Sequence, residues 1–137
     1  MKISKSTTSK DNLLKSLVWQ FVTDKKNHQH ISVILNNHED VKSFHKDFIE
    51  TLNQLPGGVS HIKRSLPGKI VSVFGTEIFI YKSSQNMAGL VFEKIIIQFD
   101  LFSEIVASGA DNRLVKLLQK SRARGCELIL MTNCDKY

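Results

Sequence analysis

Apolar and polar residues follow two different spacings along this chain, and the first is helical. Apolar residues recur every three or four positions in residues 10–25 and 38–55, as on one face of a helix. Asn37 stands where it can cap the second of these helices. Shorter patterns predict a helix over about 102–107 and a strong one over about 111–124.

The second spacing is that of buried strands. Three short, nearly continuous apolar runs cover Ile31–Leu35, Ile95–Phe99 and Glu127–Met131, which is typical of strands buried on both faces. Residues 69–74 and 77–81 are separated by a glycine-containing turn and predict a hairpin. The alternation of helices and strands predicts a three-layer α/β fold, with a mainly parallel central sheet, helices on both faces and a β-hairpin.

Length and composition favour one domain. The chain has 137 residues, of which 42% are hydrophobic, so we expect a single α/β domain over residues 1–137 with a flexible tail at 1–9. No run of 18 apolar residues is present, and the first ten residues lack the apolar centre of a signal peptide. We therefore expect a cytoplasmic protein, in the host cytoplasm if the source is viral, with Cys126 and Cys134 as free thiols.

The charge distribution is uneven. Residues 1–70 carry eleven bases and six acids, a net of +5, whereas residues 71–137 carry eight bases and seven acids, a net of +1. The whole chain has a formal charge of +6, which permits a polyanionic partner such as nucleic acid without requiring one.

Two groups of bases are candidates for contact with such a partner. The first is a stripe on the helix expected at 111–124, in a segment from Asn112 to Gly125 that contains no acid: Arg113, Lys116, Lys120, Arg122 and Arg124. The second lies in and just after the loop expected at 56–68: Lys63, Arg64 and Lys69. The alternative interpretation of the stripe is a solvated helix face that the helix dipole stabilises near Gly125.

Four segments of the chain form a pattern when they are taken together. Ser4–Thr7, with Lys5, precedes the first expected helix, and Gly75–Ser84 covers the turn and second strand of the expected hairpin. Phe92–Ile97 and Leu128–Asn133 contain two of the apolar strands. In this order the segments resemble the phosphate loop, the hairpin, the strand before the acidic motif and the coupling strand of P-loop motor ATPases, above all large terminase subunits and helicase-like proteins. The resemblance implies a fold of the P-loop type and a role beside nucleic acid.

The departures from that pattern concern catalysis. No strand and no glycine precede Ser4, although a phosphate loop needs both. Gln98 and Phe99 occupy the positions of the acidic pair that would hold Mg²⁺ and orient water, and Asp100 comes late. The resemblance therefore implies a degenerate, non-catalytic relative, and we expect no catalytic residue, cofactor or metal ion.

The histidines could be considered as metal ligands. His28, His30, His38 and His45 lie close in sequence, but His38 and His45 are about two helical turns apart, roughly 10 Å along the axis. We therefore interpret them as solvent-facing side chains.

Three functions remain open at this stage. The first is a non-enzymatic accessory protein of phage or mobile-element type that binds nucleic acid, DNA rather than RNA, or an acidic protein of a replication or packaging machine. The second is a nucleotide hydrolase or nuclease-like enzyme using Asp100, Glu104 and Glu77. The third is an inhibitor or scaffold that binds a viral or host protein.

Overall fold

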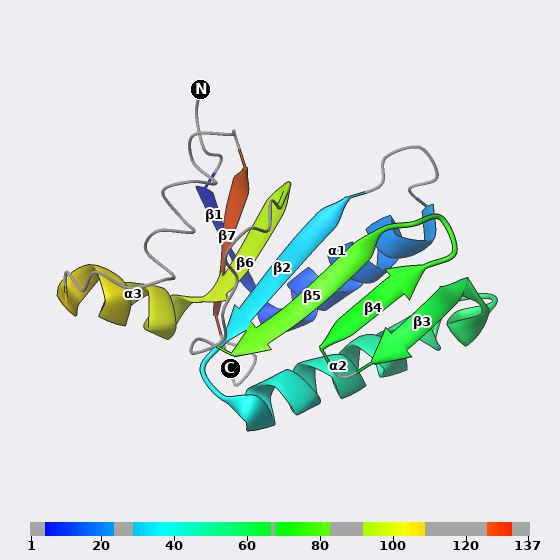
Figure 1. Cartoon of the computed structure of the whole chain (residues 1–137), viewed down its shortest axis with the longest axis horizontal. Helices are drawn as coiled ribbons and strands as arrows, with labels where there is room; N and C mark the ends of the chain where they lie inside the picture. The colour runs from blue at the N-terminus through cyan, green and yellow to red at the C-terminus, as the bar shows by residue number, and fades with distance from the viewer. Residues whose placement is uncertain (1–4, 24–28, 67, 83–91, 109–125, 133–137) are drawn as a thin grey trace.

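The computed structural model of this chain describes residues 5–23, 29–66, 68–82, 92–108 and 126–132. Its centre is a seven-stranded sheet with the strand order β1-β7-β6-β2-β5-β4-β3 (Figure 1). The strands are β1 Lys5–Ser9, β2 His30–Leu35, β3 Ile62–Leu66, β4 Lys69–Ser72, β5 Glu77–Lys82, β6 Lys94–Gln98 and β7 Glu127–Thr132.

Most of this sheet is parallel, as the sequence predicts. The strands β1, β7, β6, β2 and β5 pair in parallel, whereas β4 pairs antiparallel with both β5 and β3. The expected hairpin is therefore β4 and β5, and its turn contains Gly75 at φ 95°, in the left-handed region that glycine adopts without strain.

The three α-helices begin within three residues of the end of a parallel strand. They are α1 Lys10–Thr23, α2 His38–Leu52 and α3 Phe99–Ser108, and a short 3₁₀ helix η1 covers Gly58–His61. The side chain of Asn37 caps α2 by accepting a hydrogen bond from the backbone N–H of Asp40 at 2.9 Å. The Ser9 hydroxyl oxygen likewise accepts from the backbone N–H of Asn12 at 3.3 Å, at the start of α1. No helix in the described ranges is long and apolar enough to span a membrane.

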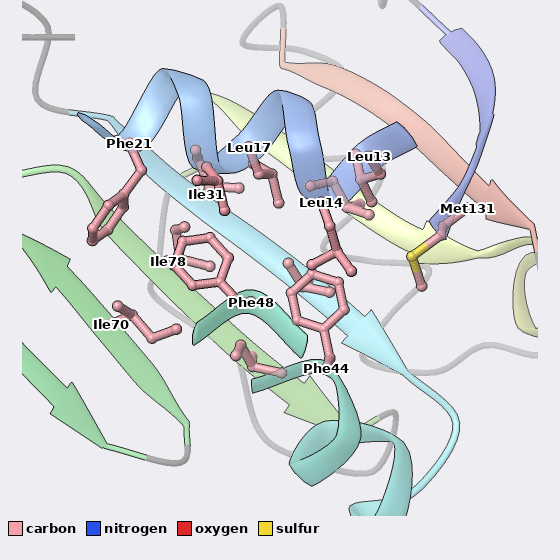
Figure 2. Close-up of a cluster of buried hydrophobic side chains, with 14 of the residues drawn as sticks. Leu13, Leu14, Leu17, Phe21, Ile31, Phe44, Phe48, Ile70, Ile78 and Met131 are labelled. Atoms are coloured by element: carbon pink, nitrogen blue, oxygen red, sulfur yellow. The ribbon is translucent and has the colours of Figure 1, made fainter. Parts of the chain in front are cut away.

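Two cores form on the two faces of the sheet. The first lies under α1 and α2, where leucines of α1 and the rings of Phe44 and Phe48 pack on β2 and β5 (Figure 2). The second lies on the opposite face and includes Phe92, Leu101 of α3 and Cys126. Helices therefore cover both faces, and the predicted layered α/β fold is confirmed.

The N-terminal tail is a correction to the sequence-based interpretation. Residues 5–9 form the edge strand β1, which pairs in parallel with β7 from Lys5 opposite Leu128 to Ser9 opposite Thr132. An all-polar segment can form an edge strand because the neighbouring strand supplies its hydrogen bonds. Such a segment has no apolar pattern, so the sequence alone does not predict the strand.

Two further boundaries differ from expectation. The segment 56–68, expected to be a loop, contains η1 and the edge strand β3. Phe99, expected to end a strand, is instead the first residue of α3, which starts three residues before the predicted helix. The helix expected at 111–124 lies outside the described residues.

Candidate functional site

The carboxyl edge of the parallel strands is the first place to look for a ligand, because open α/β sheets bind ligands there. At this edge α1, α2 and α3 begin directly after or within three residues of β1, β2 and β6. A hollow at this edge, lined by residues of α1, α2, β2, β6 and β7, has a volume of about 50 Å³. Its lining residues are Lys10, Leu35, Asp40, Ser43, Phe44, Gln98 and Met131.

Gln98 occupies the end of β6, where a motor ATPase would carry the first carboxylate. Its side chain is only 4% exposed, and its Oε1 accepts a hydrogen bond from the backbone N–H of Asn36 at 2.7 Å. The Asn36 amide in turn donates from Nδ2 to Asp100 Oδ2 at 3.3 Å. The uncharged Gln98 therefore ties β6 to the end of β2 and supplies no anionic ligand for a divalent cation.

Lys10 opens α1 at the position that a phosphate-binding lysine takes in a P-loop. The sequence interpretation gave that role to Lys5, which instead lies in β1. The Nζ of Lys10 lies 2.6 Å from Asp47 Oδ2 of α2, and both side chains are partly buried. The strand-to-helix step from Ser9 to Lys10 contains no loop residue, so no string of backbone N–H groups is available to surround a phosphate. The Ser-Lys pair directly before an amphipathic helix is the signal that could have identified Lys10.

Of the carboxylates in the enzymatic alternative, Glu77 lies apart from Asp100. Asp100 lies in the first turn of α3, and its Oδ1 accepts a hydrogen bond from the backbone N–H of Leu101 at 3.0 Å. Glu77 begins β5 opposite His30, at the other end of the parallel strands. Glu104 belongs to α3, but its side chain lies outside the described part.

Glu77 belongs instead to a charged cluster at the amino edge. Lys69 Nζ lies 2.7 Å from Glu77 Oε2, and His30 Nε2 lies 3.1 Å from Glu77 Oε1. The hydrogen bond from Lys69 is the main cause that lowers the pKa of Glu77, with a further contribution from His30. The backbone N–H of His30 also donates to Glu93 Oε2 at 2.7 Å.

The other histidines make separate contacts. His45 of α2 shares a hydrogen bond of 2.9 Å with the Ser65 hydroxyl of β3, and burial lowers its pKa. His61 bonds to the carbonyl oxygen of Pro56 at 2.9 Å, while His38 is exposed. His28 lies outside the described residues. Within the described ranges no group of three or more His, Cys, Asp or Glu side chains could hold a metal ion.

The three residues of the second predicted basic group differ in their contacts. Lys63 and Arg64 are exposed on the edge strand β3, and no described carboxylate forms an ion pair with either. Lys69, on the neighbouring β4, pairs with Glu77 and places its Nζ 5.0 Å from the centroid of the Phe79 ring. The predicted basic stripe from Arg113 to Arg124 lies outside the described residues.

Comparison with known proteins identifies the fold. No family model matches the sequence, and no curated protein does. Among solved structures, the crystal structure of the bacteriophage HK97 large terminase is similar, with a TM-score of 0.65 and 12% sequence identity. The similarity covers 95% of this chain and 29% of that chain, so this protein spans less than a third of the terminase's length. The chain therefore has a terminase-like α/β fold.

Proposed function

We propose that this protein is a non-catalytic accessory component of phage or mobile-element nucleic-acid machinery, which acts in the host cytoplasm and binds DNA through a basic surface. The terminase-like fold supports the association with such machinery. In this proposal the chain is a degenerate relative of the P-loop core, and the surface includes Lys63 and Arg64, with Lys69 and the bases of 113–124 as further contacts.

The observation that carries the DNA-binding proposal is the basic edge of the sheet at β3, where no described carboxylate pairs with Lys63 or Arg64. Lys63 and Arg64 are exposed on β3, and the chain contains no Asp or Glu between Glu50 and Glu77. A neighbouring anion would neutralise these charges and weaken their attraction for phosphates, so this acid-free segment favours a polyanion. The same charges would suit an acidic protein of a replication or packaging machine, which is the second candidate partner.

The carboxyl edge supports the non-catalytic part. Ligand pockets typically measure about 300–1,000 Å³, whereas the two described hollows beside Lys10 measure about 50 and 220 Å³. Lys10 is engaged by Asp47, and Gln98 is engaged by Asn36. These contacts use the groups that a triphosphate and its Mg²⁺ would need.

Salt-dependent binding to a mixed-sequence DNA duplex tests the proposal. We expect a Lys63→Ala, Arg64→Ala variant to bind more weakly than the parent and to flatten the slope of log K against log salt by about 0.9 for each phosphate contact removed. The matched control is Lys15→Ala, Lys46→Ala, which removes the same charge from exposed positions on α1 and α2 where each lysine faces a carboxylate. Equal behaviour of the two variants would contradict a role for the β3 edge.

Calorimetric titration with Mg-ATP tests the non-catalytic part. We expect no binding at micromolar concentrations. The non-catalytic part would be overturned by micromolar binding that disappears in Lys10→Ala or Lys5→Ala, or by ATP hydrolysis by the parent. Either result would favour the enzymatic alternative.

A further inference from the structure

Two rows of side chains cross β3, β4 and β5 on the face of the sheet opposite α1 and α2. The registers place Leu66, Lys69 and Phe79 in one row across the three strands, and Arg64, Val71 and Glu77 in the next row. Residues directly opposite each other on paired strands point to the same face. Of the described helices, α3 packs on this face at β6 and β7, away from β3, β4 and β5 (Figure 1).

Two aromatic rings lie on this face, two residues apart on β5. The rings of Phe79 and Tyr81 are nearly parallel, with an angle of 5° between their planes and 6.1 Å between their centroids. The buried ring of Phe92 meets both edge to face, at 5.7 and 6.3 Å. Phe92 therefore fixes the orientation of both rings from the core side, while Phe79 and Tyr81 stay partly exposed.

Apolar and basic side chains surround the rings. Leu66 on β3 is 52% exposed and adds apolar surface to the row that contains Phe79. Lys69 lies over the Phe79 ring, and Arg64 is exposed one row away. Glu77 is the acid of these two rows, and its ion pair with Lys69 at 2.7 Å compensates its charge.

The charge state of Tyr81 suits the same partner. A tyrosine with its ordinary pKa is neutral at neutral pH, and burial raises the pKa of the Tyr81 hydroxyl further. The face is therefore aromatic and apolar at its centre, with positive charge beside it.

We propose that this surface, defined by Arg64, Leu66, Lys69, Val71, Phe79 and Tyr81, binds single-stranded DNA, with bases stacked on Phe79 and Tyr81 and phosphates held by Arg64. The proposal rests on the proposed function and names the form of nucleic acid that it takes. Unpaired bases offer their flat faces to aromatic side chains, and a basic border follows the backbone. A duplex keeps its bases stacked on one another, so it can use the border but not the rings.

The test compares a fluorescein-labelled oligo-dT of about 20 nucleotides with a mixed-sequence duplex, each titrated with the full chain at fixed salt. We expect Phe79→Leu and Tyr81→Leu each to weaken oligo-dT binding about tenfold or more and to change duplex binding less than about twofold, because leucine is apolar but has no flat ring for stacking. Tyr81→Phe keeps the ring and should bind like the parent. Phe102→Leu is the matched control, because it removes a half-buried ring from the same core at α3.

A second measurement needs no substitution. An oligonucleotide containing 5-bromodeoxyuridine, crosslinked to the parent protein by ultraviolet light, should label the peptide that carries Phe79 and Tyr81. Labelling confined to other peptides would overturn the proposal even if a leucine variant failed to fold.

The outcomes separate the two proposals. If duplex and oligo-dT bind equally and the ring variants behave like the parent, the stacking surface is wrong while the basic edge stands. If oligo-dT binding depends on the rings, the proposal is supported. If neither nucleic acid binds the parent, both proposals fail and an acidic protein becomes the partner to seek.

Discussion

The two faces of the sheet share the same strands, but their side chains are covered to different extents. On the face under α1 and α2, Phe44, Phe48 and Leu52 are at most 1% exposed. On the opposite face, α3 covers the β6–β7 end, while Phe79 and Tyr81 on β5 stay partly exposed. The face to which a strand residue points therefore decides whether its side chain is buried or partly exposed. Buried and partly exposed side chains alternate along β5.

The difference separates stability from recognition. The covered face holds most of the fully buried large side chains, and its rings meet each other, with Phe21 and Phe48 at 5.2 Å and 83°. The partly open face places aromatic rings beside bases, where burial is incomplete and contact with a partner can add to it. Substitutions on the two faces should therefore have different effects.

The largest expected effect is on the covered face. Phe48→Ala should reduce the free energy of unfolding by about 3–5 kcal/mol, because it leaves a cavity under α2. Phe79→Ala should cost less than half as much, because its ring is already partly in solvent. Urea unfolding followed by circular dichroism measures both, and equal losses would show that the second face is as closed as the first.

The cap of α2 should have a smaller effect. Asn37→Ala removes the acceptor of the Asp40 N–H and should cost about 1 kcal/mol of unfolding free energy. Asn37→Asp keeps an acceptor at the same place and should be close to neutral. If Asn37→Ala left the unfolding free energy unchanged, packing of the covered face alone would be enough to hold the start of α2.

Two buried hydroxyls should have a smaller effect still, with the opposite sign. Ser32 Oγ and Thr76 Oγ1 are buried and have no hydrogen-bond partner among the described residues. Ser32→Ala and Thr76→Val should therefore raise the unfolding free energy, each by up to about 1 kcal/mol, because a desolvated polar group is removed. Destabilisation by Ser32→Ala would reveal a partner for this hydroxyl on the partly open face.

Thiol reactivity tests how well α3 covers the β6–β7 end of the second face, and little change in stability is expected. Burial raises the pKa of Cys126 to about 11, with a further contribution from the charge of Glu93. The thiol is therefore neutral at pH 8, and in a Cys134→Ser background it should react with a disulfide reagent much more slowly than in urea. Rapid reaction of the native protein would show that the β6–β7 end opens as readily as the β5 end.

Local patterns in the sequence determined the elements that are buried. The apolar run Ile31–Leu35 predicted β2 to within one residue, and the spacing of Val41, Phe44 and Phe48 predicted α2 and its packed side. Asn37 was identified as a cap because capping depends on groups only three residues apart. Burial requires apolar residues at regular spacing, and capping requires particular residues at helix ends. Both can be recognised in the sequence, so the layered fold could be predicted from it.

The edge strands and the candidate sites depended on pairing across the chain. β1 is polar and β3 is mostly exposed, so neither carries an apolar pattern, and each is a strand because β7 or β4 supplies its hydrogen bonds. The pairing of Lys10 with Asp47 joins residues 37 positions apart. The strand order that places Lys69 beside Phe79 likewise comes from long-range register, which no local spacing encodes. The sequence by itself determined which segments are buried, and only the tertiary structure decided which charges neutralise each other and which remain on the surface.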